Sequence, residues 1–132
     1  MNYNTAQLAE ITGSVLHGDG NLVVTNIAFD SRNIFSSAKT AFLAINSPKN
    51  SGEKYISDVV EKGIQIIISE KHLNIEDISN IVVENSLKFI QKLAKYHLNQ
   101  FSLKTIGITG SNGKTIVKEW LFQSLSEDFV TV

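Results

Sequence analysis

The sequence predicts an α/β layered fold in two parts. Short β-branched apolar runs alternate with segments whose apolar residues recur at helical spacing, up to about residue 100. Beyond that point an apolar run, a glycine-rich loop and a helical run follow one another over 105–125. We therefore expect an α/β domain over residues 1–101, followed over residues 102–132 by the first strand, loop and helix of a second domain. The expected boundary lies within Phe101–Lys104.

The first expected element is a helix over residues 5–11. Leu8 and Ile11 would share its apolar face, Asn4 or Thr5 would cap its N-terminus, and Gly13 would end it in a left-handed conformation. These local signals define a short amphipathic helix at the start of the chain.

Turn-forming residues separate the elements that follow. Gly18–Asn21 lies between two short apolar runs, which predicts a β-hairpin. Asn46–Gly52 contains the only proline and predicts a loop. The long second helix of the first domain is expected to start at Asn85 or Ser86 and to reach Gln100. The remaining expected elements are strands over 26–29, 40–45, 64–69, 81–83 and 105–109, and helices over 55–62 and 117–125.

Composition narrows the class of protein. The chain of 132 residues carries a formal net charge of −1, which gives no electrostatic reason to expect nucleic acid or an anionic membrane as partner. It has no cysteine, which excludes disulfides and thiolate zinc sites, and its three histidines lack metal-ligand spacing. No leader pattern opens the chain, and no apolar run approaches the ~20 residues of a membrane-spanning helix. We expect a soluble cytoplasmic protein.

A phosphate-binding loop is the strongest chemical signal. Glycines let backbone N–H groups approach a phosphate, and the N-terminus of the following helix adds partial positive charge. Lys114 adds a full charge directed at the β- and γ-phosphates, and the Thr115 hydroxyl suits Mg²⁺. We assign both residues to catalysis, and Thr115 also to metal binding. The residues predicted to bind ATP are Thr109, Gly110, Ser111, Asn112, Gly113, Lys114 and Thr115.

The spacing of this loop departs from the common form G-x-x-x-x-G-K-[ST]. Ile108 stands five residues before Gly113, and the other glycines are Gly107 and Gly110. The alternative interpretation is a glycine-rich turn that only caps a helix, with Lys114 in solvent. The order of apolar run, loop and helix favours phosphate binding.

The stretch Ile-Thr-Gly-Ser-Asn-Gly-Lys-Thr over 108–115 resembles the ATP loop of the Mur ligases, the amide-forming enzymes of peptidoglycan precursor synthesis, which share the shifted glycines. Folylpolyglutamate and cyanophycin synthetases have the same loop type. Val117-Lys118-Glu119 most resembles the Mur ligases that add D-alanyl-D-alanine. The resemblance implies ATP and Mg²⁺ as cofactors, UDP-N-acetylmuramoyl-peptide and D-alanyl-D-alanine as substrates, and an acyl phosphate intermediate.

The resemblance extends to Asp30-Ser31-Arg32, which follows an expected strand. In the later Mur ligases such a turn helps to hold the uridine diphosphate end of the substrate, which implies substrate binding by Asp30, Ser31 and Arg32. Physically, a serine hydroxyl can bond a uracil or ribose, and a guanidinium offers a planar fork to a diphosphate. The alternative is a capped turn in which Arg32 pairs with a nearby acid.

Two segments depart from the family pattern. In this chain the expected strand over 40–45 ends with Phe42–Ile45. After the corresponding strand the family usually has Leu-Lys-Gly, followed by Asp-Gly-His. Here Ile45-Asn46-Ser47 and Ser51-Gly52-Glu53 occupy those places. Asn46 is the candidate substitute for the missing lysine as a substrate-binding residue.

Only residues 116–132 follow the loop, so we expect an N-terminal part of a larger ligase that is inactive by itself. Its apolar residues within 105–132 should fold back on the first domain, be disordered or drive self-association, because exposed apolar surface is unfavourable. Four alternatives stay open. Two are ligases: one that adds the third residue (diaminopimelate or lysine), and a dipeptide-adding ligase fused to an alanine racemase. The other two are a stand-alone module that binds a uridine nucleotide or a protein, and a small P-loop regulator, which the short segment after the loop disfavours.

Overall fold

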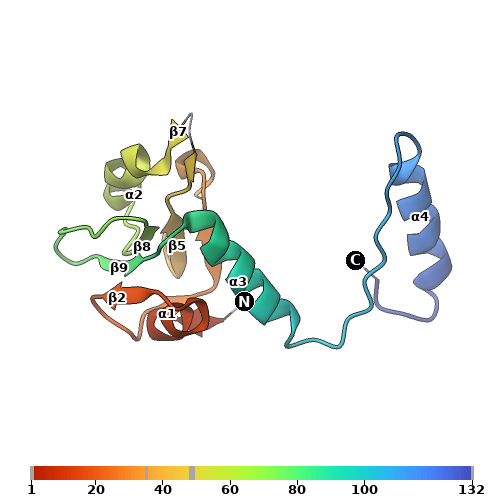
Figure 1. Cartoon of the computed structure of the whole chain (residues 1–132), viewed down its shortest axis with the longest axis horizontal. Helices are drawn as coiled ribbons and strands as arrows, with labels where there is room; N and C mark the ends of the chain where they lie inside the picture. The colour runs from red at the N-terminus through yellow and green to blue at the C-terminus, as the bar shows by residue number, and fades with distance from the viewer. Residues whose placement is uncertain (1, 35, 48–49, 132) are drawn as a thin grey trace. The chain divides into compact units, whose positions relative to one another are not determined.

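The chain divides into two units, Met1–Phe101 and Ser102–Val132 (Figure 1). The computed structural model describes every residue except 1, 35, 48–49 and 132. A five-stranded sheet lies at the centre of the first unit, in the order β2 (Val15–His17), β9 (Ser79–Val82), β8 (Ile66–Ser69), β5 (Thr40–Leu43) and β4 (Asn26–Ala28). Strands β9, β8, β5 and β4 are parallel to one another, and β2 pairs antiparallel with β9. The predicted α/β fold class is confirmed.

Shorter elements complete the first unit. Strand β1 (Tyr3–Asn4) pairs with β3 (Val23–Val24), and β6 (Asn46–Ser47) pairs with β7 (Asn50–Ser51). The helices are α1 (Thr5–Thr12), α2 (Ile56–Glu61) and α3 (Ser86–Leu98), with short 3₁₀ turns η1 (Ser31–Asn33) and η2 (Gly52–Tyr55).

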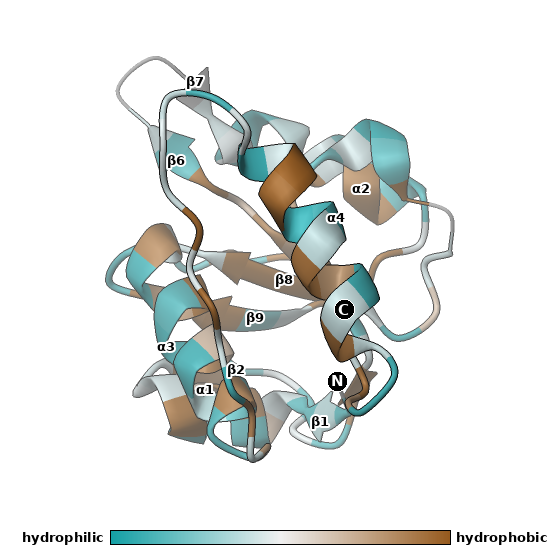
Figure 2. Ribbon diagram, turned by 90° about the vertical axis from the view of Figure 1, so that its right-hand side faces the viewer, coloured by the Kyte–Doolittle hydropathy of each residue, from teal (hydrophilic) through white to brown (hydrophobic). Residues whose placement is uncertain are grey.

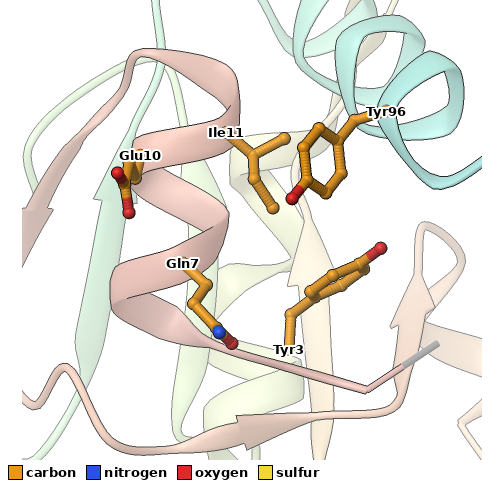
Figure 3. A pocket seen from close by; sticks show the side chains of 5 residues that line it. All are labelled: Tyr3, Gln7, Glu10, Ile11 and Tyr96. Carbon is orange, nitrogen blue, oxygen red and sulfur yellow. The ribbon is translucent and has the colours of Figure 1, made fainter. Parts of the chain in front are cut away.

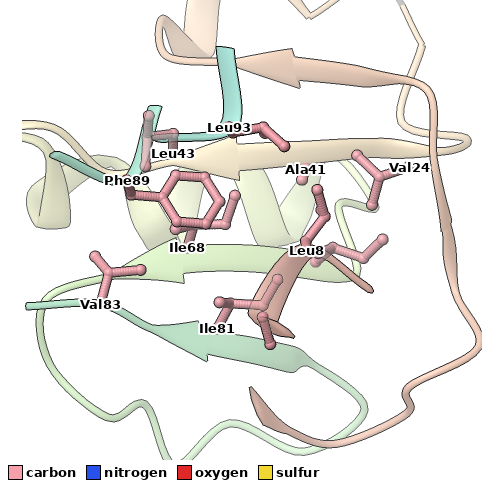
Figure 4. Packing of buried hydrophobic residues seen from close by; sticks show 11 residues of the cluster. Leu8, Val24, Ala41, Leu43, Ile68, Ile81, Val83, Phe89 and Leu93 are labelled. Carbon is pink, nitrogen blue, oxygen red and sulfur yellow. The ribbon is translucent and has the colours of Figure 1, made fainter. Parts of the chain in front are cut away.

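Two apolar clusters cover the two faces of the sheet. Successive strand residues point to opposite faces, so Ala41 and Leu43 of β5 belong to one cluster and Phe42 to the other. Helices α1 and α3 contribute to the first cluster (Figure 4), and α2 contributes to the second. The first unit is therefore a three-layer arrangement with the sheet in the middle. The helical members of the first cluster are Leu8, Ala9, Phe89 and Leu93, and those of the second are Ile56 and Val59.

Side-chain caps explain where two helices begin. The Asn4 side chain accepts a hydrogen bond from the Gln7 backbone N–H (2.8 Å), and the Gln7 side chain accepts one from the Asn4 N–H (2.9 Å). Asn85 accepts from the Lys88 N–H (2.9 Å) and so caps α3. Helix α1 ends at Gly13 in the left-handed conformation. The predicted caps Asn4 and Asn85 and the predicted stop at Gly13 are confirmed.

The hairpin predicted around Gly18–Asn21 is wrong. Strand β2 pairs with β9, whereas β3 pairs with β1. The turn is held by long-range bonds, because the Asp19 N–H donates to Ser79 Oγ (2.9 Å) and the Asp19 carbonyl accepts from Thr5 Oγ1 (2.6 Å). Tertiary pairing therefore overrides the local turn signal. In the predicted loop 46–52, residues 46–47 pair with 50–51, and residues 48–49 lie outside the described residues.

Helix α4 (Lys114–Leu125) lies in the second unit and confirms the helix predicted after the glycine-rich loop. The strand predicted over 105–109 is wrong, since these residues form no strand. A strand needs a partner for its N–H and C=O groups, and none of the described residues of 102–131 forms one. Helix α4 has no buried residue, and Trp120 is 65% exposed. Figure 2 shows apolar bands along this helix.

Candidate functional site

Polar residues follow the carboxyl ends of the four parallel strands. Asp30–Arg32 comes after β4, Asn46 after β5, Glu70–Lys71 directly after β8, and Ser86 after β9. Since parallel strands end at one edge of the sheet, these residues lie along the same edge. In open α/β sheets ligands bind outside this edge. The sequence-predicted substrate residues Asp30, Ser31, Arg32 and Asn46 all belong to it.

The Asp30–Arg32 turn is closed by its own side chains. Asp30 Oδ1 accepts from the backbone N–H (3.0 Å) and from Nε (3.0 Å) of Arg32, and Oδ2 accepts from Nη2 (2.8 Å). These bonds from Arg32 lower the pKa of Asp30 to about 2. The Arg32 side chain is nevertheless 85% exposed. The Arg32 guanidinium is therefore exposed to solvent and already paired with the Asp30 carboxylate. This is the arrangement expected from the alternative interpretation, a capped turn in which Arg32 pairs with a nearby acid.

Ser31 anchors this turn to helix α2. Its residue is buried, and its carbonyl accepts a hydrogen bond from Lys62 Nζ (2.9 Å). The Ser31 hydroxyl and then Lys62 bond to Asp58, and both lower the pKa of that carboxyl. The hydroxyl thus has a protein partner, and its predicted contact with a uracil or ribose stays a prediction.

Asn46 uses the full hydrogen-bonding capacity of its side chain within the protein. Its Nδ2 donates to Glu53 Oε1 (3.2 Å) and to Glu70 Oε2 (3.1 Å). Its Oδ1 accepts from Ser51 Oγ (2.8 Å) and from the Gly52 N–H (3.1 Å). A side-chain amide has two N–H donors and two acceptor positions. Asn46 therefore joins the loop after β5 to the end of β8 and has no donor to spare.

Glu70 links this network to the start of α3. Its Oε1 accepts from the Ser86 N–H (2.8 Å) and hydroxyl (2.9 Å), and the bond from the Ser86 N–H is the main reason why the pKa of Glu70 is lowered. Lys71 pairs with Glu53 (2.8 Å), which lowers the pKa of that carboxyl. Two carboxylates and one ammonium give this cluster a net negative charge. It does not favour an anion beside Asn46.

Sequence reasoning missed Glu53, Glu70, Lys71 and Ser86. Of these, Glu70 and Lys71 directly follow a buried strand, and that position at the carboxyl edge is the signal that would have found them. Glu53 and Ser86 were not identifiable in this way, because their place in the network depends on the path of the loop after β5 and on the packing of α3.

We expect the Glu70 carboxylate to make the first unit sensitive to acid. Because its pKa is lowered in the folded chain, its stabilisation is present above the ordinary value of about 4.5 and is lost as pH falls below that value. Urea unfolding at neutral pH and at about pH 3.5 should show a smaller acid-induced loss of stability for Glu70→Gln than for wild type. Glu84→Gln, at a carboxylate 86% exposed, is the control and should behave as wild type. An equal loss in Glu70→Gln and wild type would contradict the role of the charge.

The glycine-rich loop of the second unit has the backbone form of an anion site. Gly110 (φ 155°) and Gly113 (φ 77°) occupy conformations that favour glycine, and Gly113 is the N-cap of α4. None of the described side chains caps this helix, so within the described part of the chain its first-turn N–H groups have no intrahelical or capping partner. Lys114 Nζ donates to the Gly110 carbonyl across the loop. The lysine ammonium therefore lies over the loop that leads into the N-terminus of α4.

The residues present fit a nucleotide polyphosphate with Mg²⁺. Free N–H groups at a helix N-terminus, together with an ammonium, suit phosphate oxygens, and the hydroxyl of Thr115 in the first turn suits Mg²⁺. The predicted loop residues from Thr109 to Thr115 lie together in one segment. Their contacts with nucleotide and metal stay predictions.

Other candidate chemistry is not supported. Among the described residues no group of three or more histidines, cysteines or acids could hold a metal ion. The His17 and His72 rings lie 4.1 Å apart, and His97 Nδ1 is 2.8 Å from the Tyr3 hydroxyl, as expected for a structural histidine. No helix in the described part of the chain is long and apolar enough to cross a bilayer.

No family model matches the chain. The chain is 37% identical over 102 residues to UDP-N-acetylmuramoyl-L-alanyl-D-glutamate--2,6-diaminopimelate ligase of Alkaliphilus oremlandii. This match covers 76% of this chain and 20% of the relative. The chain is also 39% identical over 90 residues to UDP-N-acetylmuramoyl-tripeptide--D-alanyl-D-alanine ligase of Rickettsia prowazekii, covering 67% of this chain and 20% of the relative. The chain thus spans about a fifth of the length of these curated relatives.

Solved structures of ligases are also similar to this chain. UDP-N-acetylmuramoylalanyl-D-glutamyl-2,6-diaminopimelate--D-alanyl-D-alanyl ligase from Acinetobacter baumannii superposes with a TM-score of 0.85 at 30% identity, over 97% of this chain and 29% of that one. MurF ligase from Thermotoga maritima in complex with ADP gives a TM-score of 0.64 at 30% identity, over 78% of this chain and 23% of that one.

Proposed function

Because this chain belongs to the Mur ligase family, we propose that it is the N-terminal part of an ATP-dependent ligase that adds D-alanyl-D-alanine to UDP-N-acetylmuramoyl-tripeptide in peptidoglycan precursor synthesis. We place the protein in the cytoplasm, where ATP is found. The observation that carries the proposal is the loop Gly110–Thr115. In this loop the N-terminus of α4 has no side-chain cap among the described residues, and Lys114 donates to the Gly110 carbonyl. The similarity to a solved Mur ligase covers 97% of the chain.

The second unit would bind the nucleotide. ATP supplies phosphoryl transfer to a substrate carboxylate in such a ligase. The loop N–H groups and Lys114 would neutralise phosphate charge, for which Lys114 must leave the Gly110 carbonyl. Thr115 would help to hold Mg²⁺. A similar solved MurF ligase is a complex with ADP, which supports the use of a nucleotide by the parent of this chain.

The first unit would bind the uridine diphosphate end of the substrate along the carboxyl edge of its sheet. Arg32 is the best-placed cation, because it is exposed and its guanidinium is held in a fixed orientation by Asp30. We propose that Asn46 acts on substrate indirectly, by holding the loop after β5 between Glu53 and Glu70. This differs from the direct contact expected of a lysine at that place.

The choice of added group rests on two observations. The Acinetobacter baumannii ligase, whose name specifies D-alanyl-D-alanyl addition, matches 97% of this chain, and Val117-Lys118-Glu119 resembles the dipeptide-adding members. The second candidate is the ligase that adds diaminopimelate or lysine as the third residue, favoured by 37% identity to the Alkaliphilus relative. The stand-alone module has less support, because similarity covers 97% of the chain and so includes residues beyond 101.

A substrate test separates these candidates. The product of the full reading frame that contains this chain is incubated with ATP, Mg²⁺ and either UDP-N-acetylmuramoyl-tripeptide plus D-alanyl-D-alanine, or the corresponding dipeptide substrate plus diaminopimelate or lysine. We expect phosphate release and a new amide only with the first pair. Turnover with the second pair identifies the third-residue ligase. Amide formation by residues 1–132 alone would contradict the proposal that this chain lacks part of the catalytic machinery.

A further inference from the structure

A pocket of the first unit does not bring complementary groups together. It has a volume of about 240 Å³, lies between α1 and α3, and is lined by Tyr3, Gln7, Glu10, Ile11 and Tyr96 (Figure 3). The carboxylate of Glu10 lies on the side of α1 turned away from the two tyrosine rings. The acidic group and the aromatic rings therefore do not converge on one ligand. The glycine-rich loop of the second unit carries a chemical feature that nucleotide binding does not use.

This feature is the pair Asn112–Gly113, the only Asn-Gly sequence in the chain. The backbone nitrogen that follows an asparagine can attack the carbonyl carbon of the asparagine side chain. A side chain on the following residue hinders this attack, and glycine has none. A Cβ built at Gly113 would meet nothing within 4 Å, so the space around the attacking nitrogen is open.

Both reacting groups are accessible and unpaired. Asn112 and Gly113 are exposed, and within the described part of the chain neither the Asn112 side chain nor the Gly113 N–H makes a hydrogen bond. Gly113 is the N-cap of α4, and the Lys114 ammonium lies over the same loop. The positive end of the helix and this ammonium both favour loss of the proton from the attacking nitrogen.

Asn85 shows how the fold protects an asparagine elsewhere. It precedes Ser86, a small residue that hinders the attack little. Asn85 Oδ1 accepts a hydrogen bond from the Lys88 N–H (2.9 Å), and the Ser86 N–H donates to Glu70 Oε1 (2.8 Å). Ser86 is buried. Attack at this position therefore requires local opening of the structure first.

We propose that Asn112 is a site of spontaneous deamidation and that the product weakens nucleotide binding by the loop. The Gly113 nitrogen forms a bond to Asn112 Cγ, and the bond between Cγ and Nδ2 breaks. Ammonia leaves and carries away the proton of the Gly113 N–H. Water then opens the cyclic imide at either carbonyl, which gives aspartate or isoaspartate. No atom is oxidised or reduced, and either product carries one additional negative charge at neutral pH.

The effect on nucleotide follows from the position of the new carboxylate. It stands between Gly110 and Lys114 in the loop predicted to hold phosphate, where like charges repel. Isoaspartate also lengthens the main chain by a methylene group before Gly113. This half of the proposal rests on the proposed function, whereas the modification itself does not. Since a bound phosphate would engage N–H groups of the loop, nucleotide should in turn slow the reaction.

The first test follows the 132-residue chain during incubation at mildly alkaline pH. Peptide mass spectrometry detects replacement of the side-chain NH₂ by OH, and chromatography separates aspartate from isoaspartate. We expect Asn112 to react about tenfold or more faster than Asn85, which must open first. It should also react faster than Asn74, an exposed residue whose β-branched neighbour Ile75 crowds the nitrogen. Reaction at Asn112 no faster than at Asn74 would overturn the proposal.

A variant checks the assignment of the reacting group. Asn112→Gln should abolish the fast reaction, because the longer side chain would have to close a larger ring. An unchanged rate of ammonia release in Asn112→Gln would place the reaction at another residue and overturn the proposal.

The second test measures the affinity for Mg²⁺–ADP by titration. Asn112→Asp, which reproduces the aspartate product, should bind ADP about tenfold or more weakly than the unmodified chain does. Asn74→Asp, the same change at an exposed residue of the first unit, should bind as wild type does. Saturating ADP should slow deamidation of Asn112 in the wild-type chain. Equal affinities of Asn112→Asp and wild type would overturn the effect on nucleotide.

The two tests separate this proposal from the proposed function. If Asn112 stays intact while the chain binds ADP, the deamidation proposal is overturned and the nucleotide site stands. If the unmodified chain binds no ADP, the nucleotide site and the predicted effect on it are overturned, whereas fast deamidation in the mass measurement still supports the modification.

Discussion

Lys114→Ala should weaken binding of ADP to this chain by about tenfold or more. A hydrogen bond to a charged group contributes about 1.5–3 kcal/mol, which corresponds to about a tenfold to 150-fold change in affinity. Lys114 is the cation whose ammonium folds over the loop, where it donates to the Gly110 carbonyl. The remaining N–H groups of the loop and of the first turn of α4 should keep a residual, weaker affinity for phosphate.

The measurement is a titration with Mg²⁺–ADP in which the amide shifts of Gly110 and Gly113 are followed. Lys118→Ala is the matched control, because Lys118 lies one turn further along α4 and pairs with Glu119 (3.1 Å). It should bind ADP as wild type does, and circular dichroism should show an intact helix in both variants. If Lys114→Ala binds ADP within about twofold of wild type, Lys114 does not contribute to phosphate binding; if wild type itself binds no ADP, the loop is only a helix cap.

Gly52→Ala should destabilise the first unit by about 3 kcal/mol, near the upper end of the usual cost of overpacking. A Cβ at this position would lie 2.6 Å from the Ile45 nitrogen and 2.8 Å from the Ala44 carbonyl carbon. Both contacts are with backbone, so no rotamer change relieves them. Moving the segments apart would also lengthen the bond from the Gly52 N–H to the Ile45 carbonyl (2.9 Å).

The expected readout is a fall in Tm of about 10 °C or more by circular dichroism, since 1 kcal/mol corresponds to about 4–8 °C for a domain of this size. Gly107→Ala serves as the control, because a Cβ there would meet nothing within 4 Å. An unchanged Tm in Gly52→Ala would show that β5 and the η2 turn can separate at little cost.

The parts of the fold that local chemistry determines were predictable from the sequence. The cap at Asn4, the left-handed stop at Gly13 and the cap at Asn85 each depend on residues within a few positions of each other. The buried strands β5 and β8 were recognisable because both faces are covered and their residues are continuously apolar or small. Such signals need no knowledge of distant partners.

The features that depend on distant partners were not predictable. The apparent hairpin at Gly18–Asn21 is decided by pairing of β2 with β9, more than sixty residues along the chain. The apolar run 105–109 has the composition of a strand, but a strand forms only beside another. In the candidate site the turn at Asp30 was foreseen, whereas the position of Asn46 between two carboxylates depends on Glu53 and Glu70 from other loops.

The division into two units also separates the chain's chromophores. The single tryptophan, Trp120, belongs to α4, whereas the three tyrosines, Tyr3, Tyr55 and Tyr96, all lie in the first unit. Indole emission excited near 295 nm therefore reports on residues 102–132, and tyrosine ultraviolet absorbance reports on residues 1–101. One denaturation experiment with both signals would reveal whether the helix that follows the glycine-rich loop melts before, with or after the sheet.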